Sequence, residues 1–348
     1  MEIRIGNKKI GDNSPVFIIA ELSANHNQQY DYAVETIKAA REAGADAIKL
    51  QTYTPDTITM DCDNEYFQIR QGTIWDGKTL YKLYREAYTP WEWQPKLKRL
   101  AEDLGLLCFS SPFDNTAVDF LEDMNVPAYK VASFEITDIP LIEYIASKGR
   151  PVIISTGIAA LYDIEEAITA CNRMGNEQIA LLKCTSAYPA PLEEMNLRTI
   201  PNLAETFHKV VGLSDHTISI SVPAASVALG AKIIEKHLIL DRNLGGPDAV
   251  FSLEPEEFRA MANAVRDVEK ALGTVSYALS DKINKSREFS RSLFIVKDTK
   301  AGDVLNEDNV RSIRPGFGLH PKYMKDILGK KAKTDIKRGT PLSWDLIG

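Results

Sequence analysis

The chain has 348 residues, of which 44% are hydrophobic and 26% charged, and its formal net charge at pH 7 is −7. This composition is typical of a folded globular protein, and the acidic balance argues against nucleic acid as a partner. The sequence contains no apolar run near the ~20 residues of a membrane span, no signal-like N-terminus and no CxxC pair, so we expect a cytoplasmic protein without membrane contacts, disulfides or a cysteine zinc site.

Eight short apolar runs predict β-strands, and each is followed by helix start signals or helical apolar spacing. The runs are residues 16–20, 47–50, 106–109, 128–131, 152–154, 179–182, 210–213 and 232–235. Eight strand–helix units in about 260 residues predict an α/β fold, the (β/α)₈ TIM barrel. A doubly wound open sheet would be favoured by a GxGxxG turn after the first strand, and the sequence has none.

Particular residues mark the starts of three helices. Residues 89–92, Thr-Pro-Trp-Glu, read as a capping box with Pro90 at the first helical position. Asp114 is expected to cap the helix after the third strand, and Pro255 to begin the last long helix of the barrel.

Two segments stand outside the strand–helix repeat. Residues 2–11 predict a β-hairpin that turns at Gly6 and Asn7 and closes the barrel bottom. Residues 53–88 form a long connection after the second strand and include seven aromatic side chains. Long ordered loops at that end of a barrel often shape the site, and we expect the same here.

The chain is predicted to have three parts: a barrel (1–275), a linker (276–290) and a small β-rich module (291–348). Residues 276–348 contain 15 Lys+Arg and 9 Asp+Glu, a net charge of +6, which leaves −13 for residues 1–275. The opposite charges suit docking of the small part onto the barrel. They are equally compatible with scattered solubilising lysines.

Polar side chains gather where the predicted strands end, which is where TIM barrels carry their catalytic residues. The set comprises Glu21, Asn25, His26, Lys49, Gln51, Ser110, Ser111, Lys130, Ser133, Glu135, Ser155, Thr156, Lys183, Thr185, Tyr188, Ser214, His216, Glu235 and His237. Packing alone does not explain this convergence on one rim, so we predict the active site there.

Two histidines of this set predict a metal site. Alternation along a strand puts Ser214 and His216 on one face, and Glu235 and His237 on one face of the next strand. Two imidazoles on neighbouring strands can hold one divalent metal and leave positions open for water and substrate. The alternative is that each is a hydrogen-bonded core histidine.

Lysines and hydroxyls of the rim predict an anion site. Lys49 and Lys130, with Ser111, Ser133, Ser155 and Ser214, form a ring of donors suited to a small molecule bearing a phosphate and a carboxylate. Two alternatives stay open. The lysines can form structural ion pairs with Glu21, Glu135 or Glu235, or one lysine can form a Schiff base, as in an aldolase.

Several sequence strings resemble those of the sialic acid synthase family, over essentially the whole chain. They are IIAELSANH (18–26), QTYTPD (51–56), FSSPF (109–113), YKVASFE (129–135), STG (155–157), GLSDH (212–216) and GPD (246–248). RSIRPG (311–316) resembles the family's C-terminal antifreeze-like (SAF, β-clip) domain. The first two strings, KCTSAYP (183–189) and Gln28 after Asn27 look most like the pseudaminate branch of the family.

The resemblance implies a transferase that condenses phosphoenolpyruvate with an amino sugar. In this branch the sugar is 2,4-diacetamido-2,4,6-trideoxy-β-L-altropyranose, and the products are pseudaminic acid and phosphate, released by C–O cleavage. Such a product serves carbohydrate biosynthesis, for example flagellin glycosylation. The neuraminate and legionaminate precursors are alternatives, because they require the same chemistry.

The resemblance also implies roles for residues. His216 and His237 would hold Mn²⁺ or Mg²⁺, and Glu21 or Glu135 would be the general base. The sugar-binding positions are Tyr188, Asp248 and Arg314, the last contributed by a partner subunit. The resemblance implies that the SAF domain caps the partner's barrel in a swapped homodimer. A non-catalytic sugar- or ice-binding protein is a third hypothesis, and the complete polar rim argues against it.

Overall fold

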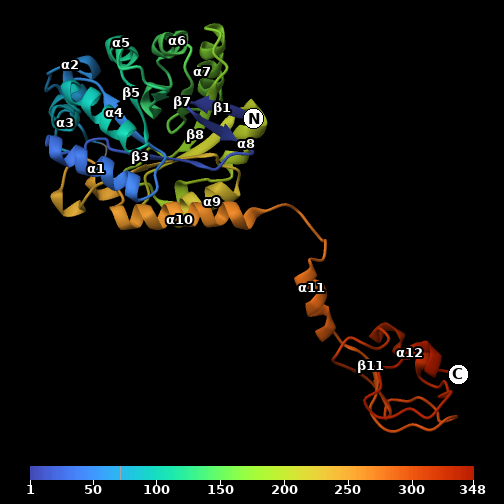
Figure 1. The fold of residues 1–348 in the computed structure, drawn as a ribbon. Coiled ribbons are helices and arrows are strands. Elements are labelled where there is room, and N and C mark those ends of the chain that lie inside the picture. Colours follow the sequence, from blue (N-terminus) through green and yellow to red (C-terminus); the bar gives the residue numbers. More distant parts are fainter. Residues whose placement is uncertain (71) are drawn as a thin grey trace. The chain divides into compact units, whose positions relative to one another are not determined.

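The computed structural model describes residues 1–70 and 72–348. They form two compact units, Met1–Gly273 and Thr274–Gly348 (Figure 1). The first unit ends at Gly273, two residues before the predicted end of the barrel at residue 275. Within the described part of the chain, no helix has both the length and the apolar character needed to cross a membrane.

The first unit is a closed barrel of eight parallel strands, in the order β10-β3-β4-β5-β6-β7-β8-β9. The strands are β3 (Phe17–Glu21), β4 (Ala47–Thr52), β5 (Leu107–Pro112), β6 (Tyr129–Val131), β7 (Val152–Ser155), β8 (Ile179–Cys184), β9 (Val210–Asp215) and β10 (Ile233–His237). Helices cover the outer face of the strands, and side chains that fill the barrel bury the inner face, which is why the strands read as continuous apolar runs. The predicted TIM barrel is confirmed.

A helix follows each barrel strand. These helices are α1 (Tyr30–Glu42), α4 (Gln94–Asp103), α5 (Asn115–Asp123), α6 (Ile139–Ser147), α7 (Leu161–Arg173), α8 (Thr199–Phe207), α9 (Ser221–Ala228) and α10 (Pro255–Leu272). Asp114 caps α5 by accepting hydrogen bonds from two backbone N–H groups, and Pro255 begins α10, as predicted. The capping box predicted at residues 89–92 was wrong: a 3₁₀ turn, Trp91–Trp93, precedes α4, and the Thr89 hydroxyl pairs with Nε2 of His26 at 3.1 Å.

The segments outside the repeat also take regular structure. Strands β1 (Glu2–Ile5) and β2 (Lys8–Gly11) form the predicted hairpin. A Cβ at Gly6 would lie 3.0 Å from the side chain of Leu107, the first residue of β5, so the turn lies at the bottom of the barrel. The connection after β4 contains α2 (Pro55–Ile58) and α3 (Leu80–Ala87).

The second unit contains α11 (Asp281–Ser286), the antiparallel strands β11 (Ser292–Ile295) and β12 (Val310–Ile313), and α12 (Met324–Ile327). It has a core of its own, formed by Leu293, Ile295, Leu305, Val310, Ile327, Ala332, Ile336, Leu342 and Ile347. Glycine is required at residue 318, because a Cβ there would lie 2.2 Å from the carbonyl oxygen of Leu293. The β-rich module predicted at the C-terminal end is confirmed.

Candidate active site

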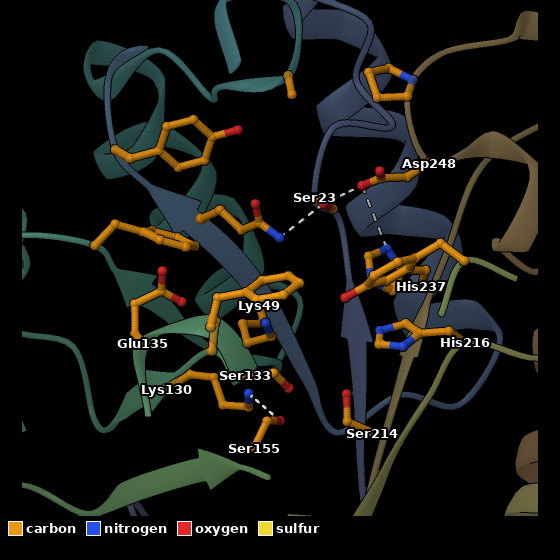
Figure 2. Close-up of a pocket in the computed structure, with 18 of the residues that line it drawn as sticks. Ser23, Lys49, Lys130, Ser133, Glu135, Ser155, Ser214, His216, His237 and Asp248 are labelled. Carbon is orange, nitrogen blue, oxygen red and sulfur yellow. Dashed lines mark hydrogen bonds and ion pairs between the residues drawn. The ribbon is translucent and has the colours of Figure 1, made fainter. Parts of the chain in front are cut away.

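A cavity opens at the carboxyl ends of the barrel strands and holds about 990 Å³ of empty space, its mouth included (Figure 2). The sequence analysis assigned a role in anion, metal or sugar binding or in proton transfer to thirteen residues. Ten of them line the cavity, namely Lys49, Lys130, Ser133, Glu135, Ser155, Tyr188, Ser214, His216, His237 and Asp248. Glu21 and Ser111 do not line the cavity, but both contact Lys49. Arg314 belongs to the second unit and directly follows β12.

The two predicted lysines are buried, but their partners differ. Lys49 forms an ion pair with Glu21, and its Nζ lies 3.4 Å from Oε1 of Glu235. Lys130 donates to the Ser155 hydroxyl at 2.6 Å and to a backbone carbonyl, and its Nζ is 3.8 Å from Glu235 Oε1. Lys49 thus matches the ion-pair alternative, whereas Lys130 is held mainly by neutral acceptors that orient its charge for an anion.

The two carboxyl groups beside these lysines have different acidities. Burial raises the pKa of Glu21 to about 7, although the Lys49 ammonium opposes this shift. Burial would also raise the pKa of Glu235, but Lys130 and Lys49 together lower it. Glu235 is therefore the permanent counter-charge of the lysine pair, and Glu21 is a group that can exchange a proton near neutral pH.

The histidines lie on neighbouring strands, as the alternation predicted. Their ring centroids are 5.3 Å apart, and both rings are buried. Nδ1 of His216 lies 3.1 Å from the carbonyl oxygen of Thr185, so we assign the proton to Nδ1, which leaves Nε2 free. Among the residues that the structure describes, buried Nδ1 of His237 has no hydrogen-bond partner, and it lies 3.8 Å from Oδ2 of Asp248.

The residues present fit a divalent metal, because Nε2 of His216 and Nδ1 of His237 have no hydrogen-bond partner among the described residues. Burial holds the pKa of His237 well below its usual range, which keeps its imidazole in the neutral form that binds metals. Among the residues that the structure describes, no three His, Cys, Asp or Glu side chains are grouped as a metal cage. A metal at His216 and His237 would therefore take its remaining ligands from water and substrate.

An ion pair lies behind the two histidines. Asp215 and Lys236, which are adjacent in the β9–β10 register, alternate with the cavity-facing residues and point to the opposite side. Lys236 donates to Oδ2 of Asp215 at 2.6 Å and also to the carbonyl of Thr217, and both charged side chains are fully buried. This pair ties together the strand ends that carry His216 and His237.

A polar chain crosses the cavity from Glu21 to Asp248. Nε2 of Gln51 donates to Glu21 at 3.2 Å and to the Ser23 hydroxyl at 2.9 Å. Ser23 in turn donates to Asp248 at 2.5 Å (Figure 2). The backbone of Ser23 has a φ of +46°, which is an uncommon conformation for a residue other than glycine. Such strain is characteristic of functional sites, where the surrounding structure imposes the geometry.

Glu135 enters the cavity from a 3₁₀ turn, Ser133–Glu135, that directly follows β6. Its Oε2 is buried and has no hydrogen-bond partner among the described residues. Burial raises the pKa of this carboxyl to about 7. A carboxyl group with a pKa near neutrality, lining a cavity, is suited to donate or accept a proton.

The Glu135→Gln substitution is expected to flatten the pH dependence of stability between about pH 5 and pH 8. The pKa of this carboxyl is higher in the folded than in the unfolded chain, so the free energy of unfolding falls as pH rises through this window. A rise from 4.5 to about 7 corresponds to roughly 3 kcal/mol. Chemical denaturation at both ends of the window measures the effect, with the exposed Glu193→Gln as control. Equal pH slopes in wild type and Glu135→Gln would contradict it.

Some lining residues were missed by the sequence analysis. Cys184 lies 3.9 Å from His216, and although burial opposes this, His216 lowers the pKa of its thiol to about 7. Trp75, Pro247 and Phe251 come from long connections rather than from strand ends. Gln51, by contrast, belonged to the predicted rim, because it shares a strand face with Lys49. No local pattern marked the others.

Comparison with known proteins assigns both units. The model of the NeuB family matches residues 36–277, and that of the SAF domain matches residues 290–348. A pseudaminic acid synthase of Campylobacter jejuni is 47% identical over 340 residues, which cover 98% of each chain. That of Helicobacter pylori is 47% identical over 332 residues, covering 95% of this chain and 97% of the relative.

A solved structure agrees with these relatives. The spore coat polysaccharide biosynthesis protein SpsE of Bacillus subtilis matches with a TM-score of 0.68 and 34% identity, covering 100% of this chain and 99% of that one. The predicted resemblance is confirmed, since the family model spans more than half of the chain and relatives match nearly all of it. The chain belongs to the NeuB family.

Proposed function

We propose that the protein condenses phosphoenolpyruvate with 2,4-diacetamido-2,4,6-trideoxy-β-L-altropyranose, giving pseudaminic acid and phosphate. The observation that carries this proposal is one cavity that combines an oriented buried lysine, Lys130, with the paired imidazoles of His216 and His237. The 47% identity to two proteins named pseudaminic acid synthase supports this choice of sugar. The reaction would transfer the three-carbon unit of phosphoenolpyruvate to the sugar, which makes the enzyme a transferase.

The lysine side of the cavity would hold phosphoenolpyruvate. Its phosphate and carboxylate need cationic and hydroxyl donors, and Lys130, Ser133, Ser155 and Ser214 supply them. Lys49 adds positive charge, and Ser111 orients it. Although the net charge of the protein is −7, these local donors would bind the anion.

The histidine side would bind the sugar, with Asp248 and Tyr188 beside it. When bound at His216 and His237, Mn²⁺ or Mg²⁺ would supply Lewis acidity to the aldehyde oxygen of the sugar. The carboxyl of Asp248, fixed by Ser23, is placed to orient a sugar amide or hydroxyl.

Acidic side chains of this chain would take part in the proton transfers of the reaction. Carbon 3 of phosphoenolpyruvate bonds to the aldehyde carbon, the aldehyde oxygen gains a proton, and positive charge develops at carbon 2. Water adds there and gives up one proton. Phosphate then leaves by C–O cleavage and takes the remaining proton of the new hydroxyl, which leaves a carbonyl group at carbon 2. Glu135 lines the cavity and has a free buried oxygen, so we assign the water-activating role to it. Glu21 does not line the cavity and would act through the two residues it contacts, Lys49 and Gln51.

Phosphate release tests the proposed reaction. The protein is incubated with phosphoenolpyruvate and, separately, with the pseudaminate, legionaminate and neuraminate precursors. We expect the highest kcat/KM with the pseudaminate precursor and no release without sugar. Release with the neuraminate precursor alone would refute the choice of sugar. Borohydride trapping of a covalent lysine adduct with a carbonyl substrate would instead support an aldolase.

Metal removal is expected to abolish turnover. Dialysis against a chelator should stop phosphate release, and added Mn²⁺ or Mg²⁺ should restore it. The His237→Ala variant should remain folded but lose Mn²⁺ binding, measured by the electron paramagnetic resonance of bound Mn²⁺. His208→Ala, which removes an exposed histidine at the end of α8, is the matched control. Full turnover by chelated enzyme would exclude a role for the metal.

We further propose that the second unit, which contains the SAF domain, caps the barrel of a partner subunit in a homodimer. Arg314 would there reach the sugar's N-acyl group. Arg314 is exposed and has no ion-pair partner among the described residues. Residues 276–348 carry a net charge of +6 against −13 for the rest, which favours docking.

The free thiols of the four cysteines and the use of phosphoenolpyruvate fit a cytoplasmic enzyme.

Deleting residues 291–348 is expected to leave a folded barrel with little activity, because the barrel has a separate hydrophobic core. Light scattering should show a dimer for the full chain. Arg314→Ala should lower activity in the full chain, with the exposed Arg338→Ala as control. Wild-type turnover by the truncated protein would contradict the capping role.

A further inference from the structure

One wall of the cavity is apolar and comes from the connection after β4. Residues of this connection that line the cavity are Tyr53, Ile58, Trp75, Leu83, Tyr84 and Ala87. Their only side-chain polar groups are the hydroxyls of Tyr53 and Tyr84 and the indole N–H of Trp75. The other aromatics of the connection do not line the cavity: they are Tyr66, whose ring is 81% exposed, Phe67, Tyr81 and Tyr88.

Trp75 presents only apolar surface to this cavity. Its Nε1 donates to the carbonyl oxygen of Pro247 at 2.8 Å, so its one polar atom already has a partner. Its ring lies 5.3 Å from that of Tyr188 and 6.5 Å from that of Phe251. Both of these rings contact the imidazole of His216, at 4.5 Å and 5.9 Å. The indole is therefore fixed one side chain away from the histidines.

The substituents of the proposed sugar differ in what they require of a wall. The acetamido groups carry N–H and C=O groups, which need hydrogen-bond partners when buried. Such partners lie elsewhere in the cavity, on Ser23, Gln51, Glu135 and Asp248. The methyl group at carbon 6, at the end of the sugar remote from the aldehyde, needs none. It is the substituent that suits contact with Trp75.

We propose that Trp75 is a specificity-determining residue that selects a sugar with a methyl group, rather than a hydroxymethyl group, at carbon 6. This inference rests on the proposed function. A hydroxyl buried against the indole, Ile58 and Leu83 would lose its hydrogen bonds to water without gaining a partner. Apolar pockets reject an added hydroxyl by roughly 10- to 100-fold in kcat/KM, and we expect a preference in this range.

Kinetics with two sugars test this role. We would measure kcat/KM for the 6-deoxy sugar and for its 6-hydroxy analogue, which differ only in that oxygen, with wild type, Trp75→Phe and Trp75→Gln. Because the ratio of the two values is independent of the amount of folded enzyme, a merely structural defect does not change it. The exposed Tyr66→Ala, in the same connection, is the matched control.

Wild type, Trp75→Phe and Tyr66→Ala should keep the preference for the 6-deoxy sugar, because each retains an apolar ring or leaves the wall intact. Trp75→Gln should reduce the ratio to within about threefold of unity, since its amide offers the hydroxyl a partner. An unchanged ratio in Trp75→Gln, or no preference in wild type, would overturn the inference while leaving the reaction established. Turnover of neither sugar by wild type would overturn the proposed function, and this inference with it.

Discussion

Replacing Lys130 with methionine is expected to lower kcat/KM for phosphoenolpyruvate by about 10³-fold, because the variant loses a charge-assisted contact in a buried site. Lys130 is 1% exposed and is oriented by Ser155 and the carbonyl of Val131. Methionine nearly preserves the volume of the side chain but removes its charge and its donors. Glu235 keeps Lys49 and Ser214 as partners, so we expect the barrel to remain folded.

Phosphate release at varied phosphoenolpyruvate concentration measures this effect. Lys148→Met is the matched control, because Lys148 is a barrel lysine whose partner Asp119 lies on the surface. Circular dichroism should show the same fold for wild type and both variants. A kcat/KM for Lys130→Met within about tenfold of wild type would show that this lysine does not bind the reacting anion.

Removing one member of the buried pair behind the histidines is expected to destabilise the barrel by about 3–5 kcal/mol. In Lys236→Met the carboxylate of Asp215 would remain fully buried, with only the N–H and hydroxyl of Thr217 as donors. The double variant Lys236→Met/Asp215→Asn removes both charges, and much of the stability should return. We also expect the single variant to weaken Mn²⁺ binding, because the pair fixes the strand ends that carry His216 and His237.

Denaturant unfolding followed by tryptophan fluorescence measures the free energy. Trp344 is the tryptophan of the second unit, so all variants would carry Trp344→Phe to make the signal report the barrel alone. Lys270→Met, which removes an exposed ion pair with Asp267 on α10, is the control and should change stability by less than about 0.5 kcal/mol. A single variant as stable as this control would refute the structural importance of the buried pair.

Much of the site was predictable because, in a TIM barrel, the position of a residue along its strand determines which way its side chain points. Parallel strands end at one rim, and alternate residues face one side, so Lys49, Lys130, His216 and His237 were predicted together. The same rule gives Gln51. It also identifies Lys236 as a residue of the opposite face, where its ion pair with Asp215 is buried.

Other features depended on contacts between distant segments. Thr89 has the local pattern of a helix cap, yet a hydrogen bond to His26, 63 residues away in sequence, uses its hydroxyl. The raised pKa of Glu135 follows from the burial of its carboxyl group, which the residue type alone does not reveal.

The sequence by itself determined the barrel, the small C-terminal module and the polar rim, because strand period and strand ends are local properties. Only the tertiary structure decided which residues of the long connections line the cavity. Trp75 was one of seven aromatics in its connection, and its hydrogen bond to Pro247, 172 residues away, fixes it against Tyr188 and Phe251. Loop side chains are placed by such long-range contacts, and no local period encodes them.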